Sequence, residues 1–246
     1  MQIVIINKPV SNLVIDIGST ALKAAWADGT TLGKTFRYQG EKRIDYILSL
    51  TENNKPDVMI ISSAIDINAK NEAKLQYRCE RLIILDSLHK GVYEKLNLPE
   101  YLSPDRAASV VASRYLFKDS PVSIFDFGTT LTVDFLDKEG NYKGGNISVG
   151  CRTRFKSVNR YSKSLPLLTI PDKTAELGED LVSSIESGII SGIIFEIGGY
   201  LAQQPENIVV FTGGDANYFA KRMKNSIFVV CNLVLMGLAI ISDYDI

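Results

Sequence analysis

Residues 13–26 read LVIDIGSTALKAAW, and this stretch decides the fold class. A continuous apolar run, typical of a strand buried on both faces, carries Asp16 near its end and passes into Gly18, Ser19 and Thr20. Glycine allows a ligand to approach the backbone closely, and successive N–H groups in such a turn can bind an anion. The hydroxyls add donors for phosphate oxygens, so the stretch predicts a strand followed by a phosphate-binding turn.

Asp16 points to a cation beside this turn. A carboxylate would repel a phosphate directly, but Mg²⁺ between the two is stable because Mg²⁺ binds one or two carboxylates together with phosphates and waters. Lys23 could offset further phosphate charge. The alternative interpretation is a tight hairpin turn in which Asp16 caps local amides.

A second copy of the phrase occurs at 123–135, SIFDFGTTLTVDF. Asp126, Gly128, Thr129 and Thr130 repeat the aspartate, glycine and hydroxyl positions of the first phrase. Two such turns facing each other would clamp a polyphosphate between two half-domains. The repeat therefore favours the phosphate interpretation over a simple hairpin.

A third glycine-bearing turn, Thr212-Gly213-Gly214-Asp215, precedes a helical stretch. Two glycines at a strand-to-helix junction suit the close approach of a flat or anionic group to a helix N-terminus. The sequence contains neither GxxxxGK[ST] nor GxGxxG, which argues against a P-loop and a Rossmann dinucleotide site.

Strands alternating with helices predict an α/β fold. The strand-like runs are 13–20, 57–65, 81–86, 122–130 and 207–215, and the helical stretches are 42–50, 105–117, 178–201 and 216–223. In both copies a strand, a turn, a strand, a turn and a strand follow one another, which indicates a duplication. The predicted halves are residues 1–118 and 119–246, with the boundary at Lys118–Pro121.

Composition limits the class of protein. The net charge of −1 provides no basic field for nucleic acid or membrane phosphate, so neither is an expected partner. The three cysteines are isolated and lack CxxC spacing, which argues against a disulfide framework and a zinc site and suits a reducing cytoplasm.

Residues 1–10 lack the basic region of a secretory leader. The apolar stretch 227–241 is too short to span a bilayer and is interpreted as a strand leading into a buried helix.

Two further features have competing interpretations. His89 is the only histidine, and without a neighbouring acid or serine constellation in the sequence we interpret it as a surface residue. The segment 151–164 carries five basic residues and no acid. It is either an anion-binding face or the solvated face of an amphipathic helix whose Phe155, Val158 and Tyr161 pack inward, and we favour the second.

The duplicated D-x-G-[ST]-T turn together with T-G-G-D resembles the superfamily of acetate kinase, sugar kinases, heat-shock ATPases and actin. Within it, the chain is most similar to the bacterial type III pantothenate kinases. The resemblance covers nearly the whole chain, through LVIDIGSTALKAA, VMIISSAI, LSPDRAAS, FDFGTTLTVDF, GGNISVG, RFKSVNRYSKSLPL, SIESGIISG, VVFTGGDA and NLVLMGL. It implies two actin-like (ribonuclease H-like) half-domains with the active site in a cleft between them.

The resemblance also implies an activity and its residues. The activity is the phosphorylation of pantothenate by ATP, the first step toward coenzyme A, with Mg²⁺ and a monovalent cation (K⁺ or NH₄⁺) in a cytoplasmic homodimer. Asp105 would be the catalytic base, although a carboxylate there is also a natural helix N-cap. The implied ATP and metal residues are Asp16, Gly18, Ser19, Thr20, Lys23, Asp126, Gly128, Thr129, Thr130, Gly213 and Gly214, and the implied substrate residues are Ser103, Arg106 and Leu181.

Four positions depart from the family pattern. Ser19 replaces asparagine, Ser103 a glycine, Val149 a proline and Leu181 a threonine that touches pantothenate. The last three motivate two alternatives, a non-catalytic nucleotide-binding regulatory relative and a kinase of another small hydroxy acid. Retention of Asp105 together with both turn aspartates favours an enzyme, because a binding module has no need of the base.

Overall fold

The computed structural model describes residues 11–244, which form two compact units. One unit comprises the residues up to Ala112 together with those from Leu233 onward, and the other is Ser113–Asn232. Residues 1–10, where no leader is predicted, lie outside the described range.

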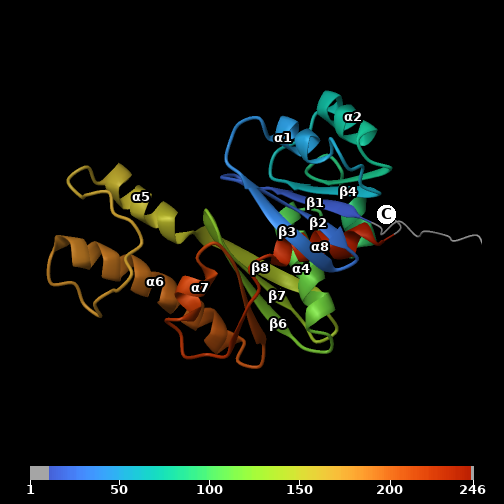
Figure 1. Cartoon of the computed structure of the whole chain (residues 1–246). Helices are drawn as coiled ribbons and strands as arrows, with labels where there is room; N and C mark the ends of the chain where they lie inside the picture. The colour runs from blue at the N-terminus through green and yellow to red at the C-terminus, as the bar shows by residue number, and fades with distance from the viewer. Residues whose placement is uncertain (1–10, 245–246) are drawn as a thin grey trace, which may run out of the picture. The chain divides into compact units, whose positions relative to one another are not determined.

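The first unit contains a five-stranded sheet in the order β3-β2-β1-β4-β5 (Figure 1). Its first three strands are antiparallel, and β4 and β5 add in parallel to β1. The strands are β1 (Asn12–Ile17), β2 (Leu22–Asp28), β3 (Thr31–Tyr38), β4 (Val58–Ser63) and β5 (Arg81–Leu85).

The second unit repeats this arrangement. Its sheet has the order β10-β9-β6-β7-β8, again with three antiparallel strands and two that extend β6 in parallel. The strands are β6 (Val122–Phe127), β7 (Thr130–Leu136), β8 (Tyr142–Val149), β9 (Ile208–Gly213) and β10 (Ile227–Val229). The shared order confirms the predicted α/β fold with duplicated, ribonuclease H-like halves.

Helices connect and flank these strands. They are α1 (Arg43–Leu50), α2 (Ala69–Tyr77), α3 (Gly91–Lys95), α4 (Pro104–Leu116), α5 (Cys151–Tyr161), α6 (Leu181–Gln203), α7 (Ala216–Ala220) and α8 (Leu233–Ser242). The helical stretches predicted from periodicity are confirmed, although the one predicted over 216–223 ends earlier, at Ala220. The strand and the buried helix that were predicted over 227–241 are β10 and α8.

The first sheet is covered on both faces. Alternate residues of β1, such as Leu13 and Ile15, form one buried cluster with Ile47 of α1 and Leu75 of α2. Helix α8 packs against β1, β2, β3 and β4 on the opposite face (Figure 1). The predicted division after residue 118 assigns α8 to the second half, whereas its contacts place it in the first compact unit.

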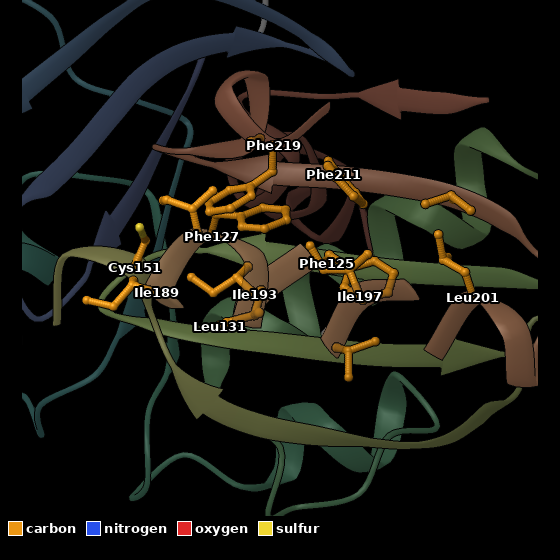
Figure 2. Packing of buried hydrophobic residues seen from close by; sticks show 14 of the residues in the cluster. Phe125, Phe127, Leu131, Cys151, Ile189, Ile193, Ile197, Leu201, Phe211 and Phe219 are labelled. Atoms are coloured by element: carbon orange, nitrogen blue, oxygen red, sulfur yellow. The ribbon is translucent and has the colours of Figure 1, made fainter. Parts of the chain in front are cut away.

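The core of the second unit lies between its sheet and α6 (Figure 2). Phe125, Phe127 and Phe211 from the strands meet an isoleucine ridge of α6, formed by Ile189, Ile193 and Ile197. Phe127 also stacks on Phe219 of α7, with ring centroids 5.1 Å apart. Burying each large side chain stabilises the fold by about 1.5–3 kcal/mol, so this core fixes the end of β6 and the turn that follows it.

Helix α5 is amphipathic, but one residue predicted to face inward does not. Phe155 is buried and Val158 packs partly against the core, whereas Tyr161 is 84% exposed. Each step of three residues rotates the side chain by about 60° backward around an α-helix. Tyr161 therefore lies about 120° from Phe155 and leaves the packed face.

Helix α6 is the one helix among the described residues that is long and apolar enough, by length and composition alone, to cross a membrane. Of its most apolar 18-residue stretch, 28% is buried inside the structure. The buried part is the isoleucine ridge, and the opposite face carries Phe195, which is 76% exposed. Helices in the cores of soluble proteins meet the same criterion, so it is weak support for a membrane span.

Candidate active site

The first predicted phosphate turn joins β1 to β2. Gly18 donates its N–H to the carbonyl of Ala21 at 3.1 Å, which closes the turn, and Ser19 and Thr20 are exposed at its tip. Asp16 lies one residue before the end of β1, directly opposite Lys23 in the antiparallel pair. The turn therefore presents its hydroxyl residues to solvent while the aspartate stays in the sheet.

Asp16 is a buried carboxylate with little compensation. Its side chain accepts one hydrogen bond, from Ser62 Oγ at 3.1 Å, and the residue is 9% exposed. Burial and, after it, the charge of Asp105 raise the pKa of Asp16, whereas Lys23 and the hydrogen bond from Ser62 lower it, and the net pKa is about 6. Asp16 and Asp105, far apart in the sequence, thus share one field of negative charge, which favours a bound cation.

A magnesium ion fits this donor set in a specific way. Among residues 11–244 no group of three or more His, Cys, Asp or Glu side chains could hold a metal by itself. Mg²⁺, however, is held by one or two carboxylates, with phosphates and waters filling the remaining positions. A buried carboxylate whose pKa is raised by burial and by a second acid suits that mode.

Asp105 and Arg106 lie in the first turn of α4. Pro104 is the first helical residue, a position that suits proline because its missing N–H has no intrahelical acceptor there. Asp105 is the second residue of the helix and therefore not its N-cap, and its Oδ1 accepts the N–H of Arg106 at 2.9 Å. Arg106 is buried at 6% exposure.

Ser103, which replaces the family's glycine, has an unstrained backbone. Among the described residues, only Asn97 and Asp119 are non-glycine residues with positive φ. The carbonyl of Ser103 accepts the N–H of Ala107 at 2.9 Å, which is the first hydrogen bond of the helix. The turn before Asp105 therefore does not require glycine.

The second turn joins β6 to β7. Counted between the last paired residues of the strands, it has three residues, one fewer than the first. Gly128 donates to the carbonyl of Thr130 at 3.0 Å, and Gly128, Thr129 and Thr130 are all exposed. Asp126 is partly exposed and lies opposite Thr132 in the antiparallel pair. The repeat thus preserves the aspartate and the exposed turn, while the return strand differs in register.

The third turn lies against the second. Gly213 has φ of 91°, and a Cβ added there would lie 2.4 Å from Asp126 Oδ1 and 2.6 Å from the Phe127 backbone. Gly214 donates its N–H to the Phe127 carbonyl at 2.9 Å. The structure therefore brings Asp126, Gly128–Thr130 and the two glycines together within the second unit, and glycine at 213 is a steric requirement.

Leu181 does not belong to these turns, and two residues beside the turn aspartates were not predicted as site residues. Leu181 is the first residue of α6 and is 55% exposed. Ser62, paired with Asp16 across the parallel strands, was not predicted, although the two adjacent serines within the apolar run 57–65 gave a signal. Asp215 accepts a hydrogen bond from Arg152 at 3.2 Å, and although it belongs to the third glycine turn, the sequence predicted no role for it.

His89 has acidic neighbours that its sequence context did not reveal. Its Nδ1 lies 2.7 Å from Asp86 Oδ1, and its Nε2 lies 3.7 Å from Glu72 Oε1. Burial raises the pKa of Asp86, but hydrogen bonds from His89 and from two backbone amides outweigh burial and hold that pKa below its usual value. His89 is partly exposed, which agrees with its interpretation as a surface residue, and its contact with Asp86 anchors the segment after β5.

Solved structures share this fold. A Campylobacter jejuni protein assigned to the Baf family of transcriptional activators aligns with a TM-score of 0.61 and 21% identity, over 93% of this chain and 96% of that one. A ROK hexokinase from Thermus thermophilus aligns with a TM-score of 0.55 and 10% identity, over 94% and 98%. The chain thus shares the α/β fold of these two structures.

The family follows from closer relatives. The pattern of the type III pantothenate kinase family matches residues 12–203. A type III pantothenate kinase of Flavobacterium johnsoniae is 31% identical over 95% of this chain and 98% of its own length. One of Bacteroides fragilis is 35% identical over the same shares. The chain belongs to the type III pantothenate kinase family, and it is therefore a kinase that uses ATP.

Proposed function

We propose that this protein transfers the γ-phosphoryl group of ATP to the primary hydroxyl of pantothenate, giving 4′-phosphopantothenate and ADP. Family membership over nearly the full chain supports this function. The observation that carries the residue roles is the electrostatic coupling of Asp105 with the buried Asp16. This coupling supports assigning the base and a cation ligand to the same site.

In the proposed mechanism Asp105 is the general base. Its Oδ1 holds the Arg106 amide, so we assign Oδ2 to the substrate hydroxyl. The hydroxyl proton passes to Asp105 as the oxygen bonds to the γ-phosphorus and the bond to the β–γ bridging oxygen breaks. Positioning and charge neutralisation account for most of the rate in phosphoryl transfer, so a fixed helical position suits the base.

Asp16 and Asp126 are the proposed ligands of Mg²⁺, which when bound neutralises phosphate charge. Each aspartate has a hydroxyl residue opposite it on the parallel neighbouring strand, Ser62 for Asp16 and Thr212 for Asp126. The matching surroundings support equivalent roles in the two halves. A monovalent cation, K⁺ or NH₄⁺, belongs to the proposal on the family resemblance alone.

The remaining site residues have proposed roles on the same basis. The exposed turn residues Gly18–Thr20 and Gly128–Thr130, together with Lys23, bind the phosphates of ATP. Gly213 and Gly214 approach its adenosine part. Arg106, with Ser103 and Leu181, forms the substrate side, and the exposure of Leu181 is compatible with a site that a second subunit completes.

The second subunit is proposed to bind along α6. One face of this helix carries Phe195 between small residues, Gly188, Gly192 and Gly199, while the opposite ridge is buried in the core. An exposed apolar helix face with small residues favours close packing against an identical helix. A homodimer in the cytoplasm accounts for this face without a membrane.

Light scattering after gel filtration tests the dimer. Phe195→Glu is expected to give a monomer, because it buries a charge in the interface. Tyr77→Glu, an exposed aromatic in the other unit, is the matched control and should leave the dimer intact. A dimeric Phe195→Glu variant would refute the assignment of this face.

ADP release tests the activity. The purified protein is incubated with Mg²⁺, ATP and K⁺, with and without pantothenate, beside Asp105→Asn. We expect pantothenate-dependent ADP formation that Asp105→Asn abolishes while its ATP affinity stays near wild type. ATP binding without turnover, on pantothenate and on related hydroxy acids, would instead identify a regulatory relative, and turnover on another acid would change the substrate.

A further inference from the structure

In each unit, a side chain of the helix after the third strand donates hydrogen bonds to backbone carbonyls of the first glycine turn of that unit. Arg43, the first residue of α1, donates from Nη1 to the Gly18 carbonyl at 2.8 Å and from Nη2 to the Ser19 carbonyl at 3.0 Å. In the second unit, Thr153 of α5 donates from Oγ1 to the Thr129 carbonyl at 2.7 Å. Each of the two helices is the next element after the third strand of its sheet in the chain.

These contacts fix the direction of the amides in each turn. A trans peptide is planar, so its C=O and its N–H point to opposite sides. No cis peptide occurs among the described residues. Because Arg43 takes the carbonyls of Gly18 and Ser19, the N–H groups of Ser19 and Thr20 point away from Arg43. The same holds for the Thr130 N–H relative to Thr153.

The different side chains follow from the different positions of the helices. Helix α5 starts directly after β8, and its N-cap Gly150 donates to the Thr129 carbonyl at 3.1 Å. A Cβ on Gly150 would lie 2.2 Å from the Gly128 carbonyl, so the helix touches the turn and a short hydroxyl side chain reaches it. Four residues separate the end of β3 from the start of α1, and a long, forked guanidinium spans the gap.

We infer that Arg43 and Thr153 are positioning residues that hold the two turns so that their amides face the nucleotide phosphates. This inference rests on the proposed function of the turns in binding ATP. Successive N–H groups held toward one side form an anion-binding concavity. Arg43 makes the stronger contribution, because its two hydrogen bonds are charge-assisted and it adds a positive charge behind the first turn.

Arg43→Met removes the donors and the charge while keeping an apolar stem. We expect the dissociation constant and the KM for Mg·ATP to rise about tenfold, and the KM for pantothenate to change less than about twofold. Lys42→Met, which removes the same charge one residue earlier, is the control and should bind ATP like wild type. Arg43→Lys keeps the charge without the fork and should recover part of the affinity.

Thr153 provides a second test that needs no charge change. Thr153→Val preserves the shape without the hydroxyl and should weaken ATP binding about threefold to fivefold, whereas Thr153→Ser should bind like wild type. Thermal unfolding of every variant checks that the fold is intact. If Arg43→Met does not fold, Arg43→Lys and the Thr153 pair decide the question.

The outcomes separate this inference from the proposed function. Wild-type ATP affinity in Arg43→Met and Thr153→Val, or equal losses in Arg43→Met and Lys42→Met, would overturn the inference. A wild-type protein that binds ATP but does not phosphorylate pantothenate would overturn the proposed function only, because calorimetric ATP binding still ranks the variants. A wild-type protein that binds no nucleotide would overturn both.

Discussion

Asp16→Asn should make the ligand-free protein more stable while removing its response to Mg·ATP. The pKa of Asp16 rises from 3.8 to about 6 in the folded protein, mainly through burial. Keeping the carboxylate ionised at pH 8 therefore costs about 3 kcal/mol of folding free energy, at 1.36 kcal/mol for each pKa unit. Asparagine is neutral and its side-chain carbonyl can still accept from Ser62 Oγ.

The sign of the pH dependence follows from proton binding. Between pH 4 and 6 the folded state binds more protons at Asp16 than the unfolded state, so the free energy of unfolding falls as pH rises. The stability difference between Asp16→Asn and wild type should grow from under about 1 kcal/mol at pH 4 to about 3 kcal/mol at pH 8. Taking this difference cancels the pH dependence contributed by groups such as Asp86, whose lowered pKa makes the protein more stable as pH rises.

Urea unfolding at pH 4, 5, 6 and 8 measures the effect. At a ligand concentration 100 times the dissociation constant, Mg·ATP should stabilise the wild-type protein by about 2.7 kcal/mol and leave Asp16→Asn unchanged. Asp28→Asn, an exposed carboxylate at the end of β2, serves as the control. Equal or lower stability of Asp16→Asn at pH 8, or a difference independent of pH, would refute the reasoning.

Three further substitutions and one matched control test other parts of the site and fold. Gly213→Ala should destabilise the protein and weaken ATP binding, because its Cβ would meet Asp126 Oδ1. Its control is Gly198→Ala, where no atom lies within 4 Å of the added Cβ. In urea unfolding this control should be neutral or stabilising by up to about 1 kcal/mol. Gly237→Ala places a Cβ 1.9 Å from the backbone of α4 and should lower the unfolding midpoint without a specific effect on the KM for ATP. Leu181→Thr should lower the KM for pantothenate about fivefold if the added hydroxyl bonds the substrate, and an unchanged KM would remove this residue from the substrate side.

Local sequence determined the elements and the turns of this protein. The apolar runs ending in Asp-x-Gly predicted β1 and β6, and the repeated strand–turn–strand pattern predicted that both sheets begin with three antiparallel strands. These features depend on neighbours in the chain, where burial on both faces and the conformational freedom of glycine are visible in the residue types. The same patterns also identified the family.

Only the tertiary structure decided which residues meet. The pairing of Asp16 with Ser62 depends on the register of two parallel strands, and its coupling to Asp105 depends on where α4 begins. The bond from Arg43 to the first turn and the packing of α8 on the first sheet are likewise long-range. Residue periodicity records which face of an element is apolar, whereas parallel pairing and helix docking are set by packing between segments distant in the sequence.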